Sequence, residues 1–326
     1  MMAAVRPQRT SAIENVAFSA AMTTSHAAAN SAGPLVSPQW LSEHQKDADV
    51  VVLDIRSAID GGGEKAYLEA HIPGSVHTDY DKGAWRVMRN NVPFVLPSVP
   101  ELDALIGDLG IDETTQVVVV PAGVSPTDFG SAARVYWTLK IAGVPNVSIL
   151  DGGVAGWKAA GLPLKSGREE PSPKIFNATI DKSMLAEVGD VEQILTSHNA
   201  TLIDARPPAF YAGKEKTPQV AAYGHIPGAL DVDSASFYDD ATNRLKSKAE
   251  LATITARIPR DKPAVSYCNT GHWAATDWFV LHELLGYKNM RLFDGSMAAW
   301  AADPKRPIES TRTKWDDLKK RLGMGS

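Results

Sequence analysis

The feature that most constrains the fold of this chain is an internal duplication. Four short motifs occur twice, in the same order, once in each half of the sequence. They are an apolar run ending in Asp-x-Arg (50–56 and 200–206), a His-Ile-Pro-Gly run (71–76 and 225–230), a second apolar run (117–120 and 264–267), and an apolar run followed by Asp-Gly and a tryptophan (147–157 and 290–300). An ordered set that recurs indicates a duplicated structural unit, so we expect two domains of similar fold.

Each copy alternates short apolar runs, rich in β-branched residues, with helical patterns. We predict helices before the first strands at Trp40–Gln45 and Met184–Thr196, and after the later strands at Ser131–Ala142 and Ala274–Leu285. This alternation is typical of an α/β fold, in which each domain is a mainly parallel sheet with helices on both faces. Ligands of such sheets bind beyond the carboxyl ends of the strands.

The length of 326 residues agrees with about two domains. The segment 162–173 holds three prolines and mixed charges, which favours an extended connection. The organisation that we expect is a disordered leader at 1–33, an N-terminal domain at 34–165, a linker at 166–175, a C-terminal domain at 176–310 and a tail at 311–326.

The leader is rich in Ala, Ser and Thr, with Arg6 and Arg9 and a single acid, Glu14. Transit peptides share this composition. It also describes a disordered leader, and Met22 is an alternative start. We expect disorder and leave targeting open. The tail carries Trp315 and several basic residues, a pattern compatible with a short helix.

Composition excludes several classes of function. Hydrophobic residues make up 44% of the chain and charged residues 22%, as in ordinary globular proteins. The net charge of -5 argues against a nucleic-acid partner. No apolar run reaches the roughly 18 residues of a membrane span.

One cysteine excludes an internal disulfide and a cysteine-rich metal site. A single functional thiol favours the reducing cytoplasm. Nothing in the sequence indicates the oligomeric state.

Cys268, the only cysteine, stands between the apolar strand 264–267 and a predicted helix. A strand-loop-helix turn directs successive backbone N–H groups at whatever occupies the loop, which stabilises an anion such as a thiolate. Gly271 supplies the backbone freedom that a tight loop needs. A lone cysteine is more often an inert buried side chain. Here the loop and the duplication favour a nucleophile.

The first copy differs at this point. Its strand is followed by Pro121–Gly130, a loop that we predict to be about four residues longer and that has no cysteine. Ser125 is an alternative nucleophile, but no histidine lies near it in sequence. We therefore expect this copy to be a structural or substrate-shaping partner.

Taken together, these motifs resemble the tandem-domain rhodaneses, a family that includes thiosulfate and 3-mercaptopyruvate sulfurtransferases. The resemblance rests on the duplicated Asp-x-Arg, His-Ile-Pro-Gly and Asp-Gly motifs and on Cys268 with Gly271, and it covers Leu35–Ile308. It implies an inactive N-terminal copy and a Cys268 persulfide, which takes sulfur from a small anionic donor and passes it to cyanide or a thiol. It implies no metal and no cofactor.

The resemblance also assigns roles to further residues. Arg206 matches the arginine of the family that holds the active loop or the donor, and its simpler alternative is a surface or Asp204-paired arginine. We expect Asp204 to be structural. His71 and His225 open the same motif in both copies, so we expect structural roles for them as well. The loop residues that we expect to bind substrate or support the loop are Asn269, Thr270, Gly271, His272, Trp273 and Ala274.

The chain departs from both branches of the family. Asn269 and Thr270 are neutral where thiosulfate-type loops carry basic residues. The mercaptopyruvate-type loop, Cys-Gly-Ser-Gly-Val-Thr, is matched only at its cysteine and second glycine. Phe210 replaces a further arginine that would grip the carboxylate of mercaptopyruvate, which makes thiosulfate the favoured donor; Lys214 or Lys216 are candidate substitutes for this arginine.

Two side chains of the loop are unusual for the family. His272 either supplies positive charge to the donor and the thiol or points to solvent. Trp273 is predicted to line the pocket wall.

Two rival functions remain to be weighed. A cysteine phosphatase needs Cys-x5-Arg, and the residue six positions after Cys268 is Ala274, which argues strongly against that reaction. A persulfide carrier that serves a protein partner would use the same cysteine. Rapid turnover of small donors and acceptors would distinguish the enzyme from the carrier.

Overall fold

The computed structural model describes residues 32–60 and 62–313. The predictions for the leader, and for the tail beyond Thr313, lie almost wholly outside these residues. The described chain contains two five-stranded sheets in which every neighbouring pair of strands is parallel. The predicted α/β class, with two parallel sheets, is therefore confirmed.

The two sheets have the same topology. The first runs β1 (Leu35–Val36), β7 (Asn146–Leu150), β6 (Gln116–Val120), β2 (Val50–Asp54) and β3 (Val76–His77). The second runs β8 (Leu185–Ala186), β14 (Met290–Phe293), β13 (Ala264–Tyr267), β9 (Thr201–Asp204) and β10 (Leu230–Asp231). Strands that arise from equivalent motifs occupy equivalent places, so the duplication in sequence is a duplication in space.

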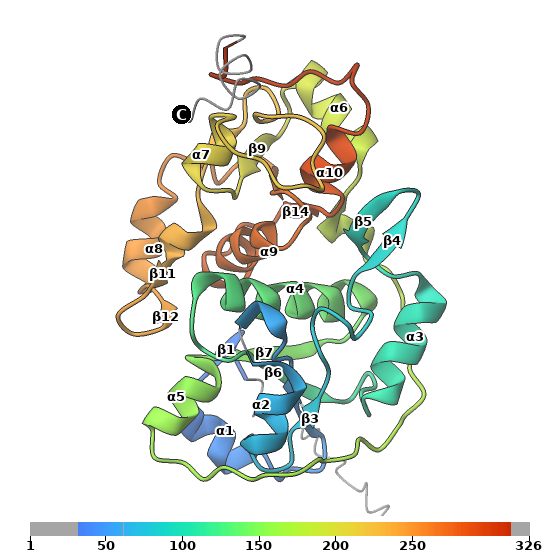
Figure 1. Cartoon of the computed structure of the whole chain (residues 1–326), viewed down its shortest axis with the longest axis vertical. Coiled ribbons are helices and arrows are strands. Elements are labelled where there is room, and N and C mark those ends of the chain that lie inside the picture. Colours follow the sequence, from blue (N-terminus) through green and yellow to red (C-terminus); the bar gives the residue numbers. More distant parts are fainter. Residues whose placement is uncertain (1–31, 61, 314–326) are drawn as a thin grey trace, which may run out of the picture. The chain divides into compact units, whose positions relative to one another are not determined.

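Helices and short hairpins complete each copy. The first copy has α1 (Pro38–His44), α2 (Gly63–Glu69), α3 (Val99–Asp108), α4 (Pro126–Ala142), α5 (Gly153–Ala159) and the hairpin β4 (Val87–Arg89) and β5 (Val92–Val95). The second has α6 (Val188–Ser197), α7 (Pro208–Tyr211), α8 (Lys248–Ile254), α9 (Trp273–Trp278), a π-helix η5 (Phe279–Leu284), α10 (Ser296–Trp300) and the hairpin β11 (Tyr238–Asp239) and β12 (Arg244–Leu245). Figure 1 shows these elements in chain order.

The buried strands explain the continuous apolar runs in the sequence. In β6, Val117 and Val119 belong to one hydrophobic core, and Val118 and Val120 belong to another on the opposite face. The second of these cores also contains Leu41 of α1 and Trp157 of α5. Because both faces are covered, a central parallel strand is apolar at every position.

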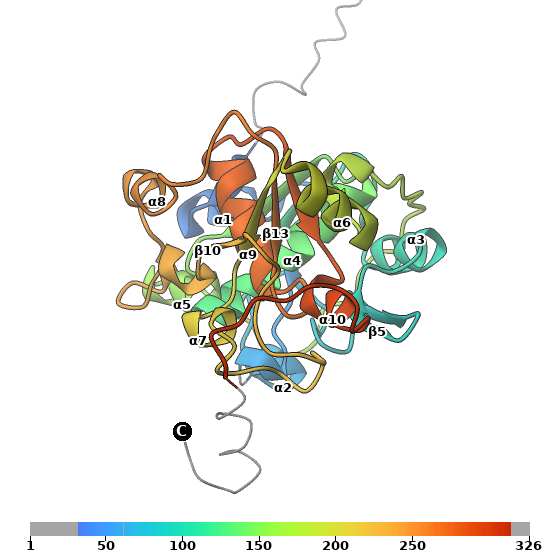
Figure 2. The same cartoon turned by 90° about the horizontal axis from the view of Figure 1, so that it is seen from above.

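The two copies share their largest hydrophobic core. Helix α4 of the first copy packs against α9 of the second, and both views place these helices side by side (Figures 1 and 2). Tyr136 and Phe279 meet edge to face with ring centroids 4.9 Å apart. This shared core brings the loop before α9 close to the N-terminal copy.

Three helix predictions were wrong at their starts, and the largest error is at α4, which begins at Pro126 and not at the predicted Ser131. The segment Lys182–Met184 is a 3-10 turn, and Leu185–Ala186 is an edge strand beside β14. Helix α6 begins only at Val188, because Glu187 and Asp190 form a capping box there. Likewise α1 begins at Pro38, before the predicted Trp40, because Ser37 caps it and proline is favoured in the first helical turn.

The prediction of a longer loop in the first copy was also wrong. Residues 121–125 and 268–272 are both five-residue loops between strand and helix. The additional length lies in the helix, because α4 has 17 residues whereas α9 has six and is followed by the six-residue π-helix. The side chain of Ser125 accepts a hydrogen bond from Asp128 N–H (3.1 Å), so Ser125 is the N-cap of α4.

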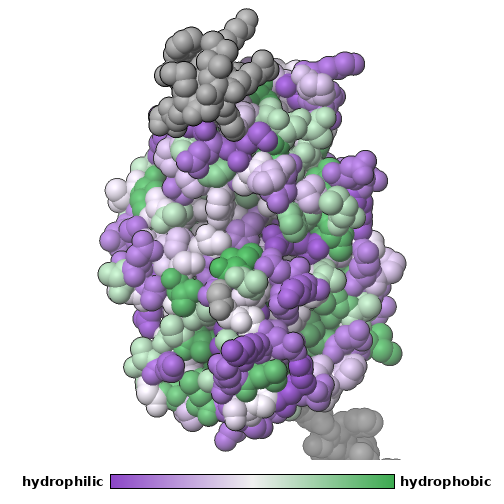
Figure 3. All heavy atoms as spheres, viewed as in Figure 1, coloured by the Kyte–Doolittle hydropathy of each residue, from purple (hydrophilic) through white to green (hydrophobic). Residues whose placement is uncertain are grey.

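The surface mixes hydrophilic and apolar residues. The side seen in Figure 3 is largely hydrophilic, with apolar residues in small separate groups. Within the described ranges, no helix combines the length and apolar character that crossing a bilayer requires.

Candidate active site

Cys268 lies directly after β13, a central strand of its sheet, and its side chain is buried with 1% exposure. Two backbone hydrogen bonds fix its position. Cys268 N–H donates to Ser296 Oγ (3.0 Å), and its carbonyl oxygen accepts from Met297 N–H (3.0 Å). Ser296 Oγ donates in turn to the carbonyl of Phe293 (2.9 Å). The turn between β14 and α10 therefore holds the cysteine backbone.

The loop after Cys268 presents unbonded amides. Among residues 32–60 and 62–313, no acceptor receives a hydrogen bond from the backbone N–H groups of Asn269 to Ala274. The Ser266 hydroxyl donates to the carbonyl of Ala274 (2.9 Å) and ties the end of the loop to β13. A curled run of free N–H groups beside a buried thiol suits an anion on the sulfur.

Arg206, two residues after the end of β9, supports this loop. Its guanidinium is fully buried and donates to Asp204 Oδ1 (2.8 Å) and Oδ2 (2.7 Å), to the carbonyl of Gly224 (2.8 Å), and to Asn269 Oδ1 (3.4 Å). The alternative of a surface arginine is therefore wrong, and pairing with Asp204 is correct. The same guanidinium also reaches the residue that follows Cys268.

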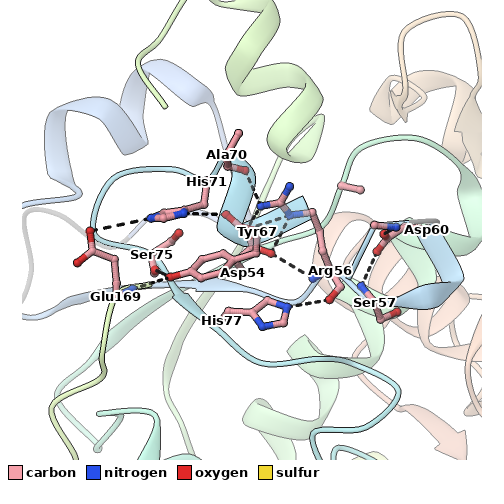
Figure 4. Close-up of polar contacts among 12 residues, drawn as sticks. Asp54, Arg56, Ser57, Asp60, Tyr67, Ala70, His71, Ser75, His77 and Glu169 are labelled. Carbon is pink, nitrogen blue, oxygen red and sulfur yellow. Dashed lines mark hydrogen bonds and ion pairs between the residues drawn. The ribbon is translucent and has the colours of Figure 1, made fainter. Parts of the chain in front are cut away.

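The first copy repeats this network without a cysteine. Figure 4 shows Arg56 paired with Asp54 (2.8 Å) while it also donates to the carbonyl of Ala70 (2.9 Å). Since both copies keep the same bonds, the Asp-x-Arg pair primarily ties the strand end to the next loop. The contact to Asn269 is the addition in the second copy.

The paired histidines also make equivalent contacts in the two copies. His71 Nδ1 bonds the carbonyl of Tyr67 (2.9 Å) and stacks on that ring, as Figure 4 shows. His225 Nδ1 bonds the carbonyl of Tyr211 (2.7 Å) and stacks on it with centroids 3.7 Å apart. These contacts support the predicted structural role of both histidines.

His272 neither points to solvent nor carries a positive charge, and its contacts fit the expected support of the loop. It is buried, with Nε2 2.9 Å from the carbonyl of Thr127 and Nδ1 2.8 Å from the Tyr80 hydroxyl. A carbonyl only accepts, so Nε2 carries a proton. In the neutral ring Nδ1 has no proton and accepts from the Tyr80 hydroxyl. Burial, followed by the charge of Arg86, lowers the pKa of His272 to about 3. The side chain is therefore neither a cation for the donor nor solvent-exposed.

Trp273 and Phe210 form a partly buried aromatic pair beside the loop. Their ring centroids lie 5.9 Å apart, edge to face, and Trp273 Nε1 lies 3.4 Å from Thr127 Oγ1. Lys216, one proposed substitute for the missing arginine, instead donates to the carbonyl of Val220 (2.8 Å), and Lys214 is exposed. The position of the missing arginine is thus occupied by an apolar ring.

Sequence reasoning missed a buried arginine that spans both copies. Arg134 of α4 donates from Nη1 to the carbonyl of Gly271 (3.2 Å), from Nη2 to Asp294, and at 3.5 Å to the carbonyl of Phe94. Asp294 Oδ2 also accepts from Leu96 N–H (2.6 Å). The available signal was an arginine within an otherwise largely apolar helix.

Gly271 has two reasons to be glycine, and both predict a loss when it is changed. Its φ of +76° is strained for other residues, and a Cβ would overlap Arg134 Nη1 and lie 2.8 Å from the Asp294 carbonyl oxygen. We expect Gly271→Ala to lower Cys268-dependent turnover about a hundredfold, because strain and overlap together distort the amides. The control is Gly228→Ala, with φ +73° but no atom within 4 Å of a Cβ. Equal activity of both variants would contradict this account.

The family comparison agrees with this geometry. The Rhodanese-like domain family matches residues 37–160 and 187–303, one match in each copy. The chain therefore belongs to the rhodanese family. More particularly, it has two domains of that family in tandem, and relatives that are named sulfurtransferases match across both copies.

Among these relatives, a 3-mercaptopyruvate sulfurtransferase of Escherichia coli (strain K12) is 31% identical over 284 residues, covering 85% of this chain and 98% of the relative. A thiosulfate sulfurtransferase of Bos taurus is 30% identical over 277 residues, covering 82% and 91%. The crystal structure of SseA from Escherichia coli, a 3-mercaptopyruvate sulfurtransferase, superposes with a TM-score of 0.70 at 31% identity, covering 81% of this chain and 99% of that one.

Proposed function

We propose that this enzyme moves a sulfane sulfur atom from thiosulfate to cyanide or a thiol through a persulfide on Cys268. The observation that carries the proposal is the thiol held beneath a loop whose six amides from Asn269 to Ala274 lack acceptors in the described chain. An anionic persulfide needs such donors. The names of the relatives support the reaction class.

The steps balance as two displacements at sulfur. The Cys268 thiolate attacks the outer sulfur of thiosulfate, the S–S bond of the donor breaks, and sulfite leaves with the bonding electron pair. In the second step, cyanide or a thiolate attacks the outer sulfur of the persulfide. Thiocyanate or an acceptor persulfide is released, and the Cys268 thiolate returns.

The neighbours of Cys268 have distinct roles in this proposal. The loop amides stabilise the persulfide, Arg206 holds Asn269 in place, and Trp273 with Phe210 forms the wall of the substrate site. The copy at 34–165 acts as a partner without a nucleophile, and the copy at 176–310 carries the chemistry. We also propose a cytoplasmic location, because a reducing compartment keeps the single thiol free.

The second candidate donor is 3-mercaptopyruvate. It is favoured by the names of two bacterial relatives, at 31% and 33% identity. Thiosulfate is favoured by the aromatic ring of Phe210, which offers a carboxylate no hydrogen-bond donor. The two donors leave different products, sulfite and pyruvate, so one assay separates them.

We expect kcat/KM for thiosulfate to exceed that for 3-mercaptopyruvate by about tenfold, the equivalent of one charge-assisted hydrogen bond to a carboxylate. Sulfite and pyruvate release are measured with cyanide as acceptor. The mass of the peptide containing Cys268 is measured by mass spectrometry after the protein has been incubated with the donor and no acceptor. A peptide heavier by one sulfur atom supports the persulfide. Faster pyruvate release would reassign the donor, and loading of the peptide without turnover would favour a persulfide carrier.

A further inference from the structure

The loop that contains Cys268 is bonded to residues of the N-terminal copy. Gly271 accepts from Arg134, and His272 bonds Tyr80 and Thr127, so two successive loop residues are held by the N-terminal copy. Arg134 lies 137 positions before its partner Gly271 in the sequence, and Tyr80 lies 192 positions before its partner His272. The copy without a nucleophile therefore touches the loop at the place where its amides curl.

Arg134 binds both segments that position the cysteine. One segment is the loop itself, through the carbonyl of Gly271. The other is the turn after β14, where Asp294 pairs with Arg134 and Ser296 accepts the N–H of Cys268. Arg134 has no exposed surface and its guanidinium lies over the ring of Trp137, 4.9 Å from the centroid. A planar guanidinium that is immobilised by packing can keep its two acceptors, the Gly271 carbonyl and Asp294, at a fixed separation.

We propose that Arg134 and Tyr80 of the N-terminal copy are positioning residues of the Cys268 site. They hold the carbonyl of Gly271 and the ring of His272, so that the amides of the loop from Asn269 to Ala274 point toward the sulfur. The proposal rests on the proposed function, because it assigns these residues to the persulfide site. The inactive copy is then a working part of the catalytic centre.

The physical reason is preorganisation. A five-residue loop with a glycine at φ +76° has several accessible conformations, and only some direct its amides at one point. Donors fixed before the reaction stabilise a developing anion without reorganisation, which acts on kcat more than on donor binding. Removing the hydrogen bond of Arg134 or of Tyr80 to the loop should therefore lower kcat and leave KM for the donor nearly unchanged.

The chain contains its own matched control. Asp151 occupies the place of Asp294 in the first copy, and it pairs with Arg244 from the second copy (Nε to Oδ2, 3.6 Å). Each matched aspartate thus takes an arginine from the opposite copy. The pair formed by Arg244 connects the copies beside the loop that lacks a cysteine, and the side chain of Arg244 is 44% exposed.

The experiment compares Arg134→Lys, Tyr80→Phe and Arg244→Lys in the full chain. We expect kcat about tenfold to a hundredfold lower in Arg134→Lys and about threefold to tenfold lower in Tyr80→Phe, with KM for the donor within about twofold of wild type. Arg244→Lys should keep the wild-type kcat. In the first two variants, amide hydrogen exchange of the peptide from Cys268 to Ala275 should be faster than in wild type.

The outcomes separate this proposal from the proposed function. Unchanged kcat and exchange in folded Tyr80→Phe and Arg134→Lys would overturn it, and so would an equal fall in all three variants, which would indicate docking of the copies in general. Tyr80→Phe removes only a hydroxyl, so it decides the matter if Arg134→Lys does not fold. If the wild type transfers no sulfur, the proposed function fails. The hydrogen exchange still tests whether the bonds from Arg134 to Gly271 and from Tyr80 to His272 order the loop.

Discussion

Replacing Cys268 by serine is expected to lower sulfur transfer by at least about a thousandfold, because a hydroxyl oxygen cannot form the S–S bond on which both steps depend. Serine is close in volume to cysteine, and the backbone bonds of residue 268 to Ser296 and Met297 do not involve its side chain. We therefore expect a folded protein. Release of sulfite or pyruvate, measured beside a thermal melt, checks both statements.

The control for this variant is Ser125→Ala in the first copy. Ser125 accepts a hydrogen bond from Asp128 N–H and caps α4, so its loss should cost about 1 kcal/mol of stability and leave turnover unchanged. Turnover that survives in Cys268→Ser and falls in Ser125→Ala would mean that the first copy carries the nucleophile.

The central strands could be predicted because their signal is local. The run from Val117 to Val120 is apolar at every position, and the structure places it in β6, buried on both faces. The edge strands β1 and β8 have only two residues each, and pairing with β7 and β14 defines them. No pattern of two residues can indicate such a pairing, because it depends on strands more than 100 positions away along the chain.

The site likewise contains residues with a local sequence signal and residues whose contacts come from distant parts of the chain. Cys268 and its loop are continuous in sequence, so a strand, a glycine and a helical pattern were enough to find them. The contacts of His272 could not be found in this way, because its partners Tyr80 and Thr127 lie in the other copy. The loop sequence suggested a charged or exposed histidine, and the shared core between α4 and α9 makes it neutral and buried.

Ser125 and Pro126 show a signal that was present but not used. A serine followed by proline, with an acid three positions after the serine, is typical of a helix start. It would have placed the beginning of α4 at Pro126, as observed, and would have shown that the loops of the two copies have equal length.

Asp277 provides the largest expected effect on stability. It lies in α9 with no exposed surface, and neither of its carboxyl oxygens has a hydrogen-bond partner among the described residues. Burial, followed by the charges of Asp233 and Asp204, raises the pKa of Asp277 well above its ordinary value. The folded protein therefore keeps this carboxyl protonated at pH values where the unfolded chain ionises it.

The sign of the pH dependence follows from linkage. Between the unfolded pKa of Asp277, near 3.8, and its raised folded pKa, the folded state binds the additional proton. Its contribution to the free energy of unfolding therefore falls as pH rises through this range, by up to about 1.4 kcal/mol per pH unit. Acid favours the folded form at this residue, and alkali opposes it.

We expect Asp277→Asn to stabilise the protein at neutral pH, with a gain that is small near pH 4 and grows toward pH 8. Asparagine has nearly the shape of the protonated carboxyl and never ionises, so it removes the cost of protonating this carboxyl when the chain folds. Each 1 kcal/mol gained should raise Tm by about 1–2 °C in a chain of this size. Thermal melts of the variant and wild type across this pH range provide the measurement.

Asp240→Asn is the control, because Asp240 is exposed and the same change of chemistry there should leave Tm unaltered. A Tm of Asp277→Asn below that of wild type at pH 8 would mean that Asp277 is ionised and stabilised in the folded protein. A gain that is equal at pH 4 and pH 8 would assign the effect to packing and not to the proton. Only a gain that grows with pH identifies Asp277 as a carboxyl kept neutral by its burial.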